Sequence, residues 1–153
     1  MDSEKEFLSS YNKNEYEKPS VAVDLLVFTV KDDRLKIVLV RRSEHPFKDM
    51  LSLPGVFVGI NETLDEAAAR GAREEAGLAD IYFEQLYTWG DIDRDPRMRI
   101  ISVSYLSLTP AEKLTLSAGS RTSSAELYDV EELLPMKSLL STTEGSSNTA
   151  GSG

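Results

Sequence analysis

The hydrophobic pattern of the chain begins with two apolar runs that are separated by a short polar segment. Residues 21–30 and 35–40 are rich in β-branched side chains, a composition that is typical of strands. The residues between them, Lys31-Asp32-Asp33-Arg34, are polar and suited to a turn. The pattern therefore predicts a β-hairpin over residues 21–40.

A helical pattern follows a polar loop at residues 41–51 and an extended segment around Pro54-Gly55. Thr63-Leu64-Asp65-Glu66 matches a capping box, in which a hydroxyl and a carboxylate bond reciprocally to backbone N–H groups. Three consecutive alanines favour helix, and Gly77 is suited to its end. We therefore expect a helix between Thr63 and Gly77.

The second half of the chain returns to extended segments. Residues 81–89 and 99–108 have strand character on either side of a charged loop at residues 90–97. Apolar side chains that alternate along a strand predict one buried face. In the second of these strands the alternating residues are Ile101, Val103 and Tyr105.

A last strand at residues 125–128 and a short helix at residues 130–134 complete the pattern. Strands, then one helix, then strands again is not the regular alternation of a doubly wound sheet, and it predicts an α+β domain with helices on a mixed sheet. We expect this domain to span residues 19–138. Residues 1–18 lack an apolar period and predict a flexible N-terminal arm, and the low-complexity residues 139–153 predict a disordered tail.

Composition narrows the classes of protein to consider. A chain of 153 residues is most simply one domain, and its net charge of -9 argues against general binding to nucleic-acid backbones. The absence of cysteine excludes disulfides, a thiol nucleophile and a cysteine-zinc site, and it suits a reducing cytoplasm. Neither a secretory signal nor a long apolar stretch is present, so we expect a cytoplasmic protein without a membrane span.

The predicted helix carries a pair of adjacent acids, Glu74 and Glu75. Residues three and four apart share a helix face, so both acids neighbour position 71. Two such carboxylates could hold a hard cation such as Mg²⁺ that also bridges the phosphates of a substrate. On an arbitrary helix they would more often be a solvated face.

Residues 56–78 resemble the Nudix box, the sequence signature of the Nudix hydrolase superfamily. Val56 stands where that family has its first glycine, and Gly71 where it has a glutamate. Leu53-Pro54-Gly55 resembles the family's lead-in to the box, and the resemblance extends over roughly residues 19–135. The positions that match the box are Glu62, Arg70, Ala72, Glu74, Glu75, Gly77 and Leu78.

The resemblance implies a Nudix fold, an α/β/α sandwich around a mixed β-sheet, and a helix that carries Mg²⁺, or Mn²⁺ in its place. It assigns metal binding to Glu62, Glu74 and Glu75, and catalysis to Glu74, Glu75 and Arg70. The glutamate missing at position 71 is a metal ligand in the family and in some members the proposed base. Some Nudix enzymes take their base from a loop outside the box, for which the candidates in this chain are Asp91, Asp93, Asp95 and Glu126.

A second resemblance concerns the ligand. Residues 85–97 resemble ADP-ribose pyrophosphatase-like Nudix proteins and also the Nudix-like sensor domain of transcriptional regulators of nicotinamide metabolism. Guanidinium groups can offer planar donor forks to phosphates, while an aromatic ring can stack on adenine or simply pack in a core. The candidate substrate-binding residues are Arg41, Arg42, Arg94, Arg97, Tyr87 and Trp89.

Two functions from different classes remain open, and the first is the leading interpretation because most of the box is intact. The first is a Mg²⁺-dependent hydrolase of a nucleoside diphosphate linked to another moiety, with ADP-ribose cleaved to AMP and ribose 5-phosphate. The second is a catalytically silent sensor domain that binds ADP-ribose or a related nucleotide, in which case the chain is a fragment of a regulator. The family implies a homodimer, and no DNA contact is expected unless a missing C-terminal module supplies it.

Overall fold

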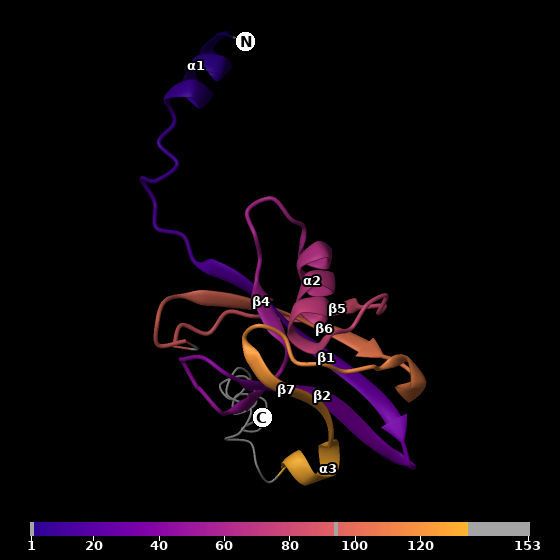
Figure 1. The fold of residues 1–153 in the computed structure, drawn as a ribbon. Coiled ribbons are helices and arrows are strands. Elements are labelled where there is room, and N and C mark those ends of the chain that lie inside the picture. Colours follow the sequence, from indigo (N-terminus) through magenta and orange to yellow (C-terminus); the bar gives the residue numbers. More distant parts are fainter. Residues whose placement is uncertain (1, 94, 135–153) are drawn as a thin grey trace.

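A computed structural model describes residues 2–93 and 95–134 and shows a mixed seven-stranded sheet with helices on it (Figure 1). The strands are ordered β3-β2-β1-β6-β5, while β4 pairs with β1 and β7 pairs with β2. The elements in chain order are α1 (Asp2–Ser10), β1 (Ser20–Lys31), β2 (Arg34–Arg42), β3 (Leu51–Ser52), β4 (Gly55–Phe57), α2 (Leu64–Ala76), β5 (Glu84–Trp89), β6 (Ile100–Leu108), η1 (Ala111–Lys113), β7 (Thr122–Asp129) and α3 (Val130–Leu133).

Strand β1 is the centre of the sheet. It pairs antiparallel with β2 and β4, and parallel with β6. The β1–β2 pairing confirms the predicted hairpin, and its turn places Asp32 and Asp33 at φ angles of 55° and 62°. Aspartate tolerates this left-handed conformation better than most residues, which explains the polar sequence at the turn.

The two faces of the sheet carry separate apolar cores because side chains alternate along each strand. Val38 and Val40 of β2 cluster with the buried alanines of α2. Ile37 and Leu39, which alternate with them, cluster instead with Leu133 of α3. Helices α2 and α3 therefore cover opposite faces, which confirms the predicted α+β class and α/β/α layering.

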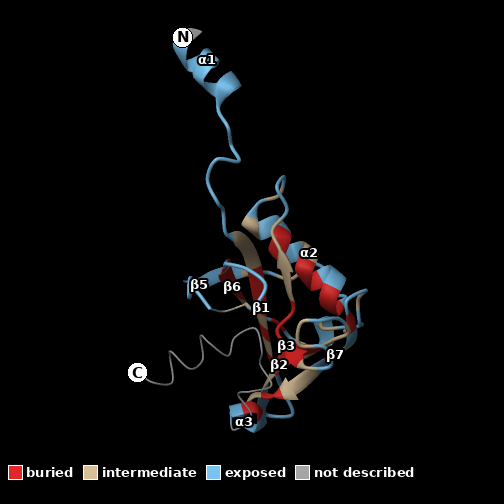
Figure 2. Ribbon diagram, turned by 90° about the vertical axis from the view of Figure 1, so that its left-hand side faces the viewer, coloured by how far each residue is buried: buried red, intermediate tan, exposed pale blue. Residues whose placement is uncertain are grey.

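Helix α2 has the ends that its sequence predicts. The Thr63 hydroxyl accepts from the Glu66 backbone N–H at 3.1 Å, and the Glu66 carboxylate accepts from the Thr63 N–H at 2.8 Å. Gly77 ends the helix in the left-handed conformation at φ 71°. Figure 2 shows one buried side of α2 against the sheet and an exposed side toward solvent.

Three strands differ in detail from the prediction. Strand β5 begins at residue 84 rather than 81, and β7 begins at residue 122 rather than 125. Strand β6 is buried on both faces rather than one. The reason is that the small serines on its second face are buried and have polar partners: Ser102 donates to Asp24, and Ser104 accepts from the Trp89 indole at 3.0 Å.

Residues 2–10 form a helix, α1, that lies apart from the sheet in both views (Figures 1 and 2). Its sequence gave no helical period, and its described side chains are exposed, so tertiary packing does not stabilise it. The flexibility of residues 1–18 stays a prediction, and the predicted tail at residues 139–153 lies outside the described residues. Within residues 2–93 and 95–134, no helix is long and apolar enough to cross a membrane.

Candidate functional site

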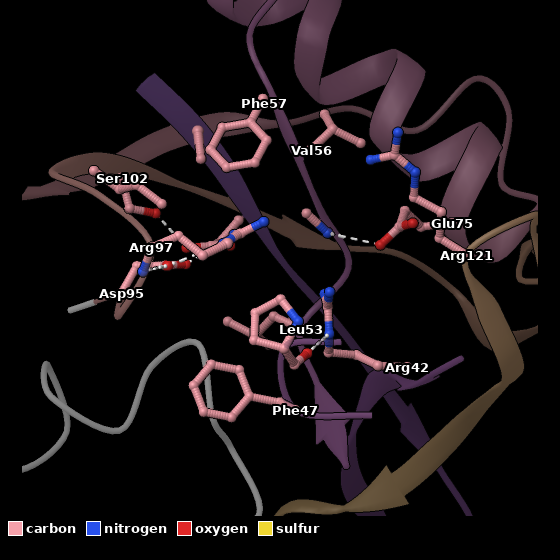
Figure 3. Close-up of a pocket in the computed structure, with 15 residues that line it drawn as sticks. Arg42, Phe47, Leu53, Val56, Phe57, Glu75, Asp95, Arg97, Ser102 and Arg121 are labelled. Carbon is pink, nitrogen blue, oxygen red and sulfur yellow. Dashed lines mark hydrogen bonds and ion pairs between the residues drawn. The ribbon is translucent and has the colours of Figure 1, made fainter. Parts of the chain in front are cut away.

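A pocket opens where β1, β4 and β6 meet the C-terminal half of α2 (Figure 3). Its walls combine backbone and apolar groups with aromatic rings, among them those of Phe47 and Phe57. The charged residues that line it come from elements far apart in the sequence. They are Asp24, Arg42, Glu75, Asp95, Arg97 and Arg121.

Two of the predicted substrate-binding arginines reach this pocket. Arg42, at the end of β2, donates its Nε to the carbonyl of Pro46 at 2.7 Å, and Figure 3 shows its guanidinium end pointing into the pocket. Arg97 donates Nε and Nη2 to the Asp95 carboxylate at 3.0 and 2.8 Å. Its Cζ also lies 5.3 Å from the centre of the Phe57 ring. The bidentate pair fixes Arg97 and lowers the pKa of Asp95.

Arg121 is a third arginine of the pocket, and it is not among the residues predicted from the sequence. The segment before β7 packs on the end of α2 so closely that a Cβ at Gly119 would lie 1.6 Å from the Glu74 carbonyl oxygen. The Gly119 N–H donates to Thr122 Oγ1 at 2.8 Å, and that hydroxyl donates to the Glu75 carbonyl at 3.2 Å. This packing holds Arg121 at the pocket, and no local sequence signal predicts it.

Glu75 is the acid of the predicted pair that faces the pocket. It is 7% exposed, and its carboxylate accepts from the Gly55 N–H at 3.4 Å (Figure 3). Burial raises its pKa, while the Gly55 N–H and the positive charges of Arg42 and Arg121 act in the opposite direction. Glu75 is thus a buried acid between two guanidinium groups.

Asp24 and Ser102 form the polar floor of the pocket. Both are buried, and the Ser102 hydroxyl donates to the Asp24 carboxylate. A sequence signal existed for Asp24, because it is the one acid inside the apolar run of residues 21–30. A carboxylate on a buried strand requires polar partners, and such a residue is a candidate for ligand contact.

The other predicted catalytic and metal-binding groups form a separate cluster around Arg70, in the middle of α2. Arg70 donates Nη2 and Nε to the Glu62 carboxylate at 2.6 and 3.1 Å, and Nη1 to Glu74 at 3.1 Å. It also donates Nη2 to the Phe57 carbonyl at 2.7 Å. Glu62 additionally accepts from the Gly59 N–H at 2.8 Å. The Arg70 hydrogen bonds, followed by that of Gly59, lower the pKa of Glu62 to about 2.

These contacts separate the carboxylates that the resemblance assigns to a metal. Glu62 and Glu74 are paired with Arg70, whereas Glu75 turns toward Gly55. Among the described residues, no group of three or more histidine, cysteine, aspartate or glutamate side chains is placed to hold a metal ion. The arrangement in this structure therefore does not fit the predicted magnesium site at Glu62, Glu74 and Glu75.

The remaining predicted residues are not brought to the pocket. Tyr87 and Trp89 lie on β5 with their ring centres 4.5 Å apart, and neither lines the pocket. Tyr87 is 57% exposed, whereas Trp89 is half-buried and donates its indole N–H to Ser104. Arg41 donates to the Asp49 carbonyl at 2.8 Å. Arg94 lies outside the described residues. Of the candidate bases only Asp95 lines the pocket; the exposed ones are Asp91, Asp93 and Glu126.

Sequence comparison shows which known proteins the chain resembles. The family model described as NUDIX domain matches residues 18–145. The chain is 37% identical over 108 residues to the ADPR responsive transcriptional repressor NtrR of Acinetobacter baylyi, covering 69% of this chain and 43% of the repressor. It is 39% identical over 119 residues to the ADP-ribose pyrophosphatase of Methanocaldococcus jannaschii, covering 77% of this chain and 66% of that enzyme. The chain thus spans less than two thirds of either relative.

Solved structures show the same similarity in three dimensions. The NUDIX domain of Shewanella oneidensis NrtR complexed with ADP ribose superposes with a TM-score of 0.79 at 30% identity, covering 86% of each chain. A MutT/nudix family protein from Enterococcus faecalis superposes with a TM-score of 0.77 at 32% identity, covering 84% of this chain and 51% of that one.

Proposed function

This chain belongs to the NUDIX domain family, and on that premise we propose that it binds ADP-ribose as a ligand-sensing domain without cleaving it. The observation that carries the proposal is the convergence of Arg42, Arg97 and Arg121 on one pocket of a chain whose net charge is -9. Three acids line the same pocket, so its formal charges balance. The N–H donors of the arginines, and not a net positive charge, favour an anionic ligand such as a diphosphate.

The arginines are suited to phosphate because each guanidinium presents several N–H donors in one plane. Arg97 is held in place by Asp95 before any ligand arrives. Less conformational entropy is then lost on binding. Arg42 is similarly held through Pro46, while its other nitrogens extend into the pocket.

The aromatic and buried polar groups of the pocket suit the base and the sugars of a nucleotide sugar. Phe47 and Phe57 offer ring faces on which a base can stack. Asp24 and Ser102 offer buried oxygens that can accept from sugar hydroxyls or a base amine. The combination of cationic, aromatic and hydroxyl-binding groups favours a nucleoside diphosphate linked to a second sugar over inorganic phosphate.

The ion pairs of the carboxylates on and near α2 favour ligand binding over cleavage. Nudix hydrolases generally use a divalent metal ion. In this chain Glu62 and Glu74 are paired with Arg70, and position 71 has no side chain. The relatedness to NtrR and to the ADP-ribose complex of NrtR supports a sensor role.

Hydrolysis, the leading interpretation of the sequence, is the second candidate, and the 39% identity to an ADP-ribose pyrophosphatase favours it. In that case Glu74, Glu75 and Arg70 would carry the chemistry with Mg²⁺, or Mn²⁺ in its place, and the products would be AMP and ribose 5-phosphate. A homodimer, a cytoplasmic location and the lack of DNA contact by this chain also stay predictions.

Isothermal titration calorimetry of ADP-ribose, with EDTA in the buffer, tests binding. We expect one site per chain, weakened roughly tenfold or more by Arg42→Gln or Arg121→Gln, because a charge-assisted hydrogen bond contributes about 1.5–3 kcal/mol. Arg73→Gln is the matched control, since Arg73 is exposed on α2 outside the pocket. Equal affinity in all four proteins, or no binding by the unaltered chain, would contradict the proposal.

Phosphorus NMR of ADP-ribose with the protein and excess Mg²⁺ separates the two candidates. A sensor shifts or broadens the diphosphate signals and gives no product over hours. Appearance of AMP and ribose 5-phosphate, abolished by Glu74→Gln and Glu75→Gln together, would establish the hydrolase instead and refute catalytic silence.

A further inference from the structure

We propose that Val56 and Gly71 form one packing pair that keeps a carboxylate side chain out of position 71 and so closes this side of α2 to a divalent metal ion. These are the two positions at which the chain departs from the Nudix box. The inference goes beyond nucleotide binding, because it concerns the wall formed by β4 and α2 whether or not the pocket holds a ligand.

The two residues are in direct contact. A Cβ built at Gly71 would lie 3.1 Å from Val56 Cγ2 and 3.5 Å from both Val56 Cγ1 and Leu25 Cδ1. Val56 packs against the main core cluster, to which the fully buried Leu25 belongs. Strand β4 is fixed by its pairing with β1, where Val56 opposes Val23. The valine therefore has little freedom to move away from α2.

Backbone conformation does not explain the glycine at position 71. Gly77 is the one described glycine with a positive φ, so Gly71 has ordinary helical backbone that any residue could adopt. Alanine is a far better helix former than glycine in a helix interior. The glycine is thus disfavoured locally, and the close approach of Val56 is the structural reason for it.

The same contact decides what α2 can offer to a metal. A glutamate at position 71 would have to extend from a Cβ whose surroundings are filled by Val56 and Leu25. One turn further along the same face, the Glu75 carboxylate is bonded to the N–H of Gly55, the residue before Val56. An apolar wall therefore occupies the place next to Glu75 where a second carboxylate would be needed.

Thermal unfolding of Gly71→Ala in two backgrounds tests the packing pair. With Val56 present, we expect Gly71→Ala to lower Tm or leave it unchanged. In a Val56→Ala background the same change should raise Tm, and the two shifts should differ by about 3 °C or more. Ala69→Gly, at an exposed position of the same helix, measures how much Tm changes between alanine and glycine where no contact with Val56 is involved. Equal shifts in both backgrounds would overturn the pairing.

Manganese binding, followed by the loss of the free Mn²⁺ signal in electron paramagnetic resonance, tests the metal part without nucleotide. We expect the unaltered chain and Gly71→Glu alone to bind no Mn²⁺ at tenth-millimolar concentrations, and Val56→Gly with Gly71→Glu to gain one site. Ala69→Glu controls for an added carboxylate.

The inference is overturned if the unaltered chain binds one Mn²⁺ that Glu75→Gln removes, or if Gly71→Glu alone matches the double variant in both Tm and Mn²⁺ binding. Failure of the double variant to gain a site, while its Tm shows that it is folded, overturns the metal part. None of these measurements uses ADP-ribose, so their failure is distinct from failure of the proposed ligand binding.

Discussion

At the residue scale, Arg70, in the middle of α2, is the side chain on which the carboxylates of Glu62 and Glu74 converge. It bonds to Glu62 and Glu74 and to the carbonyl of Phe57, so it joins the loop before the helix to the helix itself. The side chains of its two partners are 19% exposed at Glu62 and 52% exposed at Glu74. Because solvent and ions reach these carboxylates, the ion pairs are sensitive to pH and salt. In this arrangement Arg70 is a structural clamp.

The pH dependence of stability should reveal that clamp. The pKa of Glu62 falls from 4.5 to about 2 in the folded chain. A lowered pKa contributes stability that is present above pH 4.5 and is lost as the pH falls through about 2. Glu62→Gln should therefore lower the urea midpoint near neutral pH, and the deficit should shrink on acidification.

The exposed Glu112→Gln in η1 controls for the loss of one negative charge. A deficit for Glu62→Gln that stays constant between neutral pH and pH 2 would show that the Arg70 contact does not lower the Glu62 pKa.

At the scale of elements, α2 is defined by local signals at both ends. The capping box at Thr63 and Glu66 satisfies backbone groups that would otherwise lack partners, and Gly77 reverses the chain. Each signal is contained within a few consecutive residues, which is why the sequence alone predicts the helix and its boundaries.

Thr63→Ala should lower the free energy of unfolding by about 1 kcal/mol, because the cap hydroxyl no longer accepts from the Glu66 N–H. Urea denaturation measures this change. Thr63→Ser keeps a hydroxyl and should retain most of the stability. A Thr63→Ala protein as stable as the unaltered chain would mean that water replaces the cap at no cost.

Strand limits were harder to predict than the helix. The start of β7 at residue 122 depends on Thr122, whose hydroxyl bonds to the end of α2, and Gly119 is required by the close approach of the same helix. Both contacts join segments that are distant in the sequence. Periodicity over a short window contains no information about such partners.

At the scale of the whole molecule, only part of the pocket could be predicted from the sequence. The family resemblance predicted the fold, and four of the candidate residues do line one pocket: Arg42, Arg97, Asp95 and Glu75. It did not reveal that Glu62 and Glu74 would pair with Arg70 instead of gathering with Glu75. Nor did it show that the two unusual positions of the box touch, because that contact depends on how β4 crosses α2.

The parallel pairing of β1 with β6 has a consequence for folding kinetics. Ser20 pairs with Ile100, and the two strands that supply Asp24 and Ser102 to the pocket are joined by most of the domain. Pairing over such a separation is slow, since the loop must close before the contacts form. We therefore expect the pocket to be completed late in folding, so that a molecule that fills it binds only the folded state and shifts the folding equilibrium toward that state.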